Sequence, residues 1–110
     1  MTDGLLFPDL TIEERIQVIL HEEIDACRIQ TDCDLRNLDA FRAALIEPVE
    51  TRVKFNRDVW QKCWCVTREG GAYRVVYAPL LGCFSLCVEG DAGMLDIGGR
   101  GSALGCYASV

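Results

Sequence analysis

Seven cysteines give this chain its most reactive side chains, and four of them form the short motifs Cys63-x-Cys65 and Cys83-x-x-x-Cys87. Structural zinc sites usually combine two Cys-x-x-Cys pairs, so these spacings are a weak signal for a metal. Free cysteine more often packs as a small hydrophobic side chain. We therefore predict reduced, structural thiols, with no metal site and no cofactor.

His21 begins a second motif with metal-binding character, His21-Glu22-Glu23-Ile24-Asp25. Zinc proteases place two histidine ligands at positions i and i+4 of one helix. Aspartate stands in the second position here, and His21 is the only histidine of the chain. A Ser/His or Cys/His pair for nucleophilic catalysis would have to bring His21 from the polar side of its helix to the sheet, which the sequence does not suggest. An exposed helix surface is the favoured interpretation, and a protein that is not an enzyme is favoured over an enzyme.

A glycine-rich segment, Gly99-Arg100-Gly101-Ser102-Ala103-Leu104-Gly105, resembles part of a dinucleotide-binding turn. Such a site needs a following helix, a second parallel strand and an acidic residue ~20 positions later. The sequence extends only to Val110, so this segment is interpreted as a turn with glycines at positive φ.

The elements that position the cysteines are three predicted antiparallel strands within residues 59–90. Gly70-Gly71 predicts a two-residue hairpin turn that pairs Trp64 with Tyr77 and Cys65 with Val76. A second turn over residues 79–82 pairs Ala78 with Cys83. Side chains alternate across a strand, so one face collects the bulky residues: Trp60, Trp64, Val66, Tyr73, Val75, Tyr77, Phe84, Leu86 and Val88.

The opposite face of this sheet carries small side chains, among them Cys63, Cys65, Val76, Ala78, Cys83 and Ser85. Cys63 and Cys83 lie two strands apart in this register, at about 9–10 Å, which is too far for a disulfide. A monomer rarely leaves a broad apolar patch exposed. We expect either residues 102–110 or a protein partner to cover this face, and a second copy of the chain, in a homodimer, is one such partner.

Two helices are predicted before the sheet. Thr11-Ile12-Glu13-Glu14 matches a capping box, and an apolar stripe interrupted by Glu23 continues to about Arg28. A second helix presents Leu35, Leu38, Phe41 and Leu45 on one side and should end before Pro48.

Residues 49–55 alternate as a strand, although Val49, Val53 and Trp60 also fit a helix. The strand is preferred, because a tight turn at Asn56-Arg57 would pair Val53 with Trp60 on the bulky face. Met94–Ile97 is a candidate fifth strand, and residues 102–110 form a short helix or a last strand.

The predicted fold class is therefore α+β, as a single domain over residues 1–110. An N-terminal helical hairpin packs on the bulky face of a four- to five-stranded antiparallel β-meander. The first helix is expected to bury its apolar stripe (Ile12, Ile16, Ile19 and Leu20) against Trp60, Trp64, Val75, Tyr77 and Phe84.

Charge is unevenly distributed along the chain. Residues 1–50 hold 12 acidic and 4 basic residues, a net charge of −8, whereas residues 51–110 hold 5 acidic and 7 basic residues, a net charge of +2. An acidic helical half repels phosphate, which argues against nucleic acid as a partner. We predict a small protein-interaction module, such as an inhibitor or immunity-type protein, whose acidic half binds a basic protein partner. A solvated surface that only keeps the protein soluble is the plain alternative.

The N-terminus shows no signal-peptide pattern and no stretch reaches ~18 apolar residues, so a cytoplasmic protein without membrane association is expected. The alternative function is a small-ligand-binding domain or minor enzyme. Trp60, Tyr73 and Tyr77 would then line an aromatic pocket between the helices and the sheet.

Overall fold

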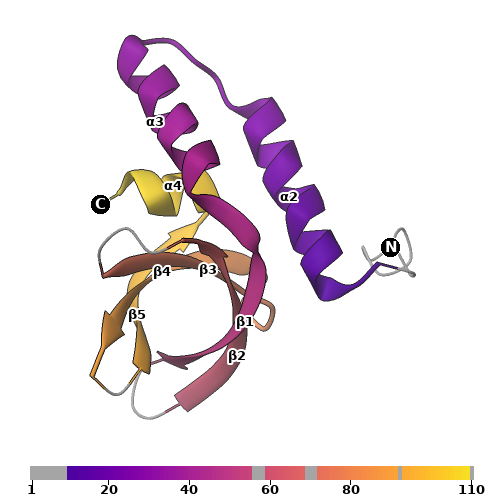
Figure 1. Cartoon of the computed structure of the whole chain (residues 1–110), viewed down its shortest axis with the longest axis vertical. Coiled ribbons are helices and arrows are strands. Elements are labelled where there is room, and N and C mark those ends of the chain that lie inside the picture. The colour runs from indigo at the N-terminus through magenta and orange to yellow at the C-terminus, as the bar shows by residue number, and fades with distance from the viewer. Residues whose placement is uncertain (1–9, 56–58, 69–71, 92, 110) are drawn as a thin grey trace.

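The computed structural model describes residues 10–55, 59–68, 72–91 and 93–109. Two helices, α2 (Ile12–Ala26) and α3 (Asp32–Ala44), precede the strands β1 (Leu45–Phe55), β2 (Val59–Thr67), β3 (Tyr73–Ala78), β4 (Cys83–Gly90) and β5 (Gly93–Gly101), and helix α4 (Ala103–Ala108) follows them. The strands close into a barrel, and the helices gather on one side of it (Figure 1). The α+β class is confirmed.

Capping boxes begin both long helices. The Thr11 hydroxyl accepts from the Glu14 amide at 3.1 Å, and the Glu14 carboxylate accepts from the Thr11 amide at 3.0 Å. Hydrogen bonds from the Thr11 backbone amide and from the Thr11 side chain lower the pKa of the Glu14 carboxyl. Thr31 and Asp34 repeat the arrangement at the start of α3. The first helix ends at Ala26, near the predicted end, and the second ends at Ala44, before Pro48 as predicted.

The register of strands β2, β3 and β4 is the predicted one. Trp64 pairs with Tyr77 and Cys65 with Val76, and Ala78 pairs with Cys83 at the second turn. Gly82 has a φ of +66° in that turn, a conformation that glycine adopts without strain. Short turns thus determined this part of the sheet.

The register between β1 and β2 differs from the prediction by one residue. Val53 pairs with Gln61 rather than Trp60, and Lys54 is the partner of Trp60. Phe55 pairs with Val59, so three residues connect the strands instead of two. The predicted tight turn itself, at Asn56-Arg57, lies outside the described residues. One extra residue moves a strand to the other face, so Val53 turns away from the bulky face.

The sheet is a closed barrel rather than the predicted open meander. An up-and-down sheet of five strands has its first and last strands running in the same direction, so the closing pair is parallel. Val53 pairs with Met94 and Lys54 with Leu95 across this closure. The fifth strand is longer than predicted, because it continues through the glycine-rich segment to Gly101.

Closure places the small-residue face inside the barrel. The interior cluster consists of Val53, Phe55, Cys63, Cys65, Val76, Ala78 and Cys87, with Met94 packed against it. Five strands enclose a narrow space, and small side chains fill such a space without strain. The expected interface on this face is therefore corrected: Cys63, Cys65, Val76, Ala78 and Ser85 are buried and Cys83 is partly buried by the protein's own strands.

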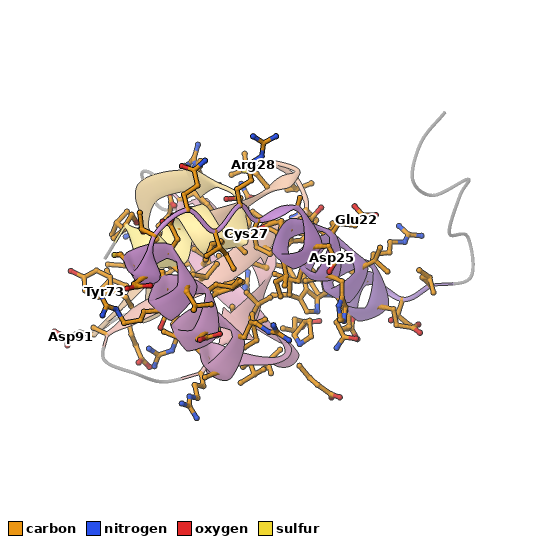
Figure 2. The ribbon with its side chains drawn as sticks, turned by 90° about the horizontal axis from the view of Figure 1, so that it is seen from above. Glu22, Asp25, Cys27, Arg28, Tyr73 and Asp91 are labelled. Atoms are coloured by element: carbon orange, nitrogen blue, oxygen red, sulfur yellow. The ribbon has the colours of Figure 1, made fainter. Side chains whose placement is uncertain are left out.

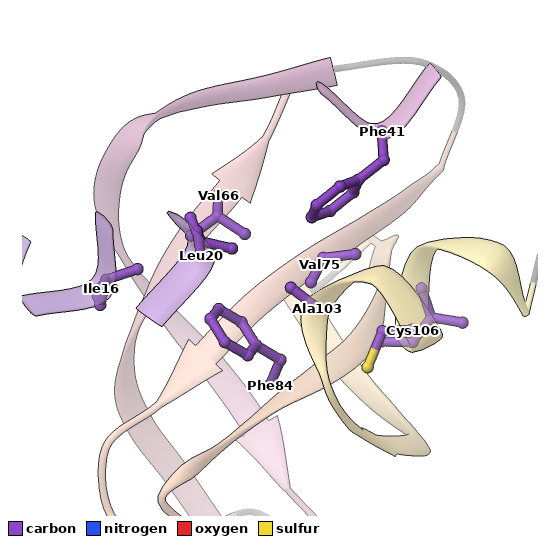
Figure 3. Close-up of a cluster of buried hydrophobic side chains, with 9 residues drawn as sticks. Ile16, Leu20, Phe41, Val66, Val75, Phe84, Ala103 and Cys106 are labelled. Atoms are coloured by element: carbon purple, nitrogen blue, oxygen red, sulfur yellow. The ribbon is translucent and has the colours of Figure 1, made fainter. Parts of the chain in front are cut away.

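The bulky face lies outside the barrel and packs against the helices. Ile16 and Leu20 of α2 and Phe41 of α3 lie over Val66, Val75 and Phe84 of the sheet (Figure 3). Ile12, Ile19, Trp64 and Tyr77 pack around this cluster as partly buried side chains. The predicted contact between the first helix and the bulky face is confirmed except at Trp60, which is 37% exposed.

The two long helices are joined by the short segment 27–31, as the predicted helical hairpin requires. They lie on the same side of the barrel (Figure 1), and each contacts α4. The Glu23 carboxylate accepts from the Leu104 amide at 3.3 Å, which explains the acidic interruption in the apolar stripe of α2. Residues 103–108 thus form a helix on the outer face instead of covering the small-residue face.

Candidate functional site

A cavity of about 660 Å³ opens between α3, α4 and strands β2 and β3. Its apolar lining consists of Ala40, Ala43, Ala44, Val75, Leu86 and Ala108. Its polar and aromatic lining consists of Asn37, Thr67, Arg68, Tyr73, Arg74 and Tyr107. The volume lies within the range of about 300–1,000 Å³ that is typical of small-molecule sites.

Backbone contacts hold the walls of this cavity together. The Arg68 amide donates to the Ala44 carbonyl at 2.8 Å, which joins the end of β2 to the end of α3. The Thr67 hydroxyl accepts from the Val75 amide at 3.0 Å and so connects β2 to β3. Alanines on the inner side of α3 leave room that larger side chains would fill. The cavity therefore follows from the helix sequence and from the position of the β2 end.

Arg74 also lines the cavity, but its charged group is already paired. Its side chain is 6% exposed and its guanidinium donates to Glu89 at 3.1 Å and to the Tyr73 carbonyl at 3.0 Å. Side chains alternate across a strand, so the Arg74 side chain lies on the same side of β3 as Val76, toward the barrel interior. Burial raises the pKa of the Cys65 thiol on that side, and the Arg74 charge partly opposes this rise.

The residues predicted to line an aromatic pocket are separated in the structure. Tyr73 lines the cavity and is 47% exposed. Tyr77 packs on Phe84 in the outer core, with ring centroids 5.1 Å apart. Trp60 lies beside Gly93, where an added Cβ would come within 3.3 Å of its Cη2 atom.

Sequence reasoning missed Arg68, Asn37 and Tyr107 as cavity residues. They come from three elements, β2, α3 and α4, which meet only in the folded chain. The one local feature of the sequence that could have indicated a cavity residue was the position of Arg68 beside the predicted hairpin turn.

The interior thiols are poorly suited to nucleophilic chemistry. Burial raises the pKa of Cys87 to about 12 and that of Cys63 to about 11, and the charge of Asp96 adds to both shifts. The thiolate is the reactive form of cysteine, and it is scarce at neutral pH under these conditions. Within the described ranges, no three or more His, Cys, Asp and Glu side chains are grouped so as to hold a metal.

Asp96 organises a polar network at the barrel interior. Its side chain is 6% exposed and accepts hydrogen bonds from the Ser85 hydroxyl, from the Gly98 amide and from the Arg100 guanidinium. Arg100 also lies over the Phe55 ring, 5.8 Å from its centroid. Ser85 is fully buried, so this Ser/Asp pair is a structural network that no substrate reaches.

The long helices present a second distinctive surface. Besides the capping residue Glu14, five carboxylates are exposed on α2 and α3, and we call them the acidic helix surface: Glu13, Glu22, Asp25, Asp32 and Asp39. Glu22 and Asp25 lie along α2 (Figure 2). The ion pairs found among the described residues, Lys62–Glu50, Arg74–Glu89 and Arg100–Asp96, involve none of these five carboxylates. His21 is exposed on α2 beside Glu22.

Comparisons of the chain with protein-family models, with curated proteins and with solved structures found no match. Of the helices in the described part of the chain, none has the length and apolar character needed to cross a membrane.

Proposed function

We propose that the protein is a binding module that engages a basic protein partner through the acidic helix surface, as an inhibitor or immunity-type protein would. The observation that carries this proposal is the exposure of five carboxylates without an ion pair among the described residues. Unneutralised charge on exposed helices steers an oppositely charged partner and selects against others.

The arrangement of the helices supports the same role. The far end of the helix pair stands away from the barrel (Figure 1). Ile29 and Leu35 near that end are 49% and 44% exposed. Apolar contacts surrounded by charged groups are the usual composition of a protein interface.

Affinity capture with charge-reversal variants tests this proposal. Wild-type protein, the variant E22K/D25K and the matched control E50K/D91K are immobilised, and recovered proteins are purified and titrated. The control has the same net charge, but its substitutions lie on the barrel at exposed positions. A basic partner should bind the wild type and the control alike, and E22K/D25K about tenfold more weakly.

Salt provides an independent readout, because surface charges are screened at high ionic strength. The affinity for the partner should fall about fivefold or more as salt rises from low to physiological concentration. A partner that binds E22K/D25K as tightly as wild type, or that is not basic, would show that the acidic helix surface is not the binding site.

A small-ligand-binding domain is the second candidate, and the cavity between α3, α4 and the β2–β3 strand ends favours it. A ligand that binds only the folded protein raises its stability. A thermal-shift screen should then find one chemical class that raises the Tm. A screen in which no class does so would leave the cavity without a role.

A further inference from the structure

The charge of the cavity lining is opposite to that of the whole protein. Arg68 and Arg74 and no carboxylate occur among the described residues that line it, whereas the chain has a net charge of −6. Because Arg74 is paired with Glu89, Arg68 carries the positive charge that a ligand would meet. A positive cavity on an acidic protein attracts small anions while the remaining surface repels them.

The two arginines differ in what they can offer a ligand. The Arg74 guanidinium already donates to Glu89 and to the Tyr73 carbonyl, so it is not available to a ligand. Arg68 is exposed at the cavity, and no ion pair joins it to another described residue. The N–H groups of its planar guanidinium can donate two parallel hydrogen bonds to a carboxylate, sulfonate or phosphate group.

The remaining lining suits a flat apolar body. Tyr73 and Tyr107 contribute aromatic surface from two sides, β3 and α4. Ala40 and Ala44 on α3 contribute a flat apolar surface to the cavity wall. Tyrosine rings provide large contact areas with few rotatable bonds, and their hydroxyls still reach polar groups.

We infer that this cavity binds a small anionic ligand with a flat aromatic body, whose acidic group is held by Arg68 and whose rings lie between the tyrosines and the alanine wall of α3. The inference rests on the ligand-binding candidate above and specifies its chemical class. It is independent of the protein partner on the acidic helix surface.

Two probes that differ in a single group test the inference. Anilinonaphthalene sulfonate carries a sulfonate, and N-phenylnaphthylamine has the same ring system without the charge. Fluorescence titration of the folded wild type should give one site for the sulfonate, with an affinity about tenfold higher than that for the neutral probe.

Three variants locate the site. Arg68→Gln should weaken sulfonate binding about tenfold and leave the neutral probe unchanged. Arg52→Gln removes the same charge from an exposed position outside the cavity, and it should change neither affinity by more than about twofold. Ala40→Trp fills the cavity and should abolish binding of both probes.

The outcomes distinguish failure of the anionic-ligand inference from failure of the ligand-binding function on which it rests. If both probes bind equally, R68Q has no effect and A40W blocks both, the cavity binds ligands but the anionic class is wrong. If neither probe binds, or if A40W leaves both affinities unchanged, the ligand-binding candidate fails together with the inference. Circular dichroism of each variant confirms that it is folded before titration.

Discussion

The rings of Phe41 on α3 and Tyr107 on α4 lie with centroids 5.5 Å apart and planes inclined by 58°. Phe41 is fully buried in the outer core, and Tyr107 also lines the cavity. The contact makes α4 the element that attaches α3 to the rest of the molecule. Because Glu23 of α2 accepts from the Leu104 amide of the same helix, α4 connects both long helices.

Substitution of Phe41 by alanine should lower the free energy of unfolding by about 3–5 kcal/mol, because it leaves a cavity in the outer core. Urea denaturation followed by tryptophan fluorescence measures this change. Leu80→Ala is the control, since Leu80 is 79% exposed, and it should stay within about 0.5 kcal/mol of wild type. A similar small effect for F41A would mean that α3 does not depend on this packing.

Enlarging a side chain inside the barrel should be costly. Ala78→Leu adds volume to the fully buried interior, and overpacking of this kind costs about 1–3 kcal/mol. Ala26→Leu adds the same atoms at an exposed helix position and should be nearly neutral. Thermal unfolding of the two variants compares them directly. An open sheet would tolerate both equally, and that result would contradict closure of the barrel.

Reactivity of the thiols should separate into two groups. Cys33 is exposed and Cys27 is partly buried, whereas Cys63, Cys87 and Cys106 are buried with raised pKa values. Titration of the native protein with an aromatic disulfide reagent should show a fast phase that C27S/C33S reduces, with partly buried Cys83 accounting for the remainder. The buried thiols should react only as fast as the protein opens. Fast modification of Cys87 in the native state would contradict its placement inside the barrel.

Stability should fall at alkaline pH because of the buried thiols. Below pH 9 the Cys87 thiol is protonated in both the folded and the unfolded protein. Above pH 9 the thiol ionises in the unfolded protein, but in the folded protein it stays protonated because its pKa is about 12. The folded state then binds more protons, so the free energy of unfolding decreases by about 1.4 kcal/mol per pH unit for this group.

The Cys87→Ala variant isolates this effect, because other groups titrate in the same range. Its stability should decline less steeply above pH 9 than that of wild type. Asp96→Asn should lower the pH at which this decline ends, since the Asp96 charge raises the pKa of Cys87 in the folded state. Identical slopes above pH 9 in C87A and wild type would rule out Cys87 as a source of the alkaline instability.

The sequence predicted the part of the fold that local turns control. The predicted pairs Trp64–Tyr77 and Ala78–Cys83 are present, although the Gly70-Gly71 turn itself lies outside the described residues, and alternation then separated the bulky face from the small one. The capping box at Thr11 and the stop before Pro48 are likewise local features. Each of these depends on interactions within a few residues.

Features that depend on distant contacts were not predictable in the same way. No turn connects β1 to β5, so nothing in the sequence predicted the Val53–Met94 pair. Without that closing pair, the small side chains were interpreted as an interface rather than as the interior of a narrow barrel. The cavity was not predicted either, because Arg68 and Tyr107 come together only after α3 and α4 have packed.

The parallel closure between β1 and β5 has a consequence for the order of folding. The antiparallel hairpins join residues that are close in the chain, whereas the Val53–Met94 pair closes a loop of about 40 residues and costs more chain entropy. The hairpins should therefore form first and the closing pair last. The β1–β5 pair should also be the first to open in the native state. Its opening would briefly admit water and solutes to the thiols inside the barrel while the outer core stays intact. The lifetime of Cys63, Cys65 and Cys87 as free thiols in an oxidising solution is then set by the opening of the β1–β5 pair.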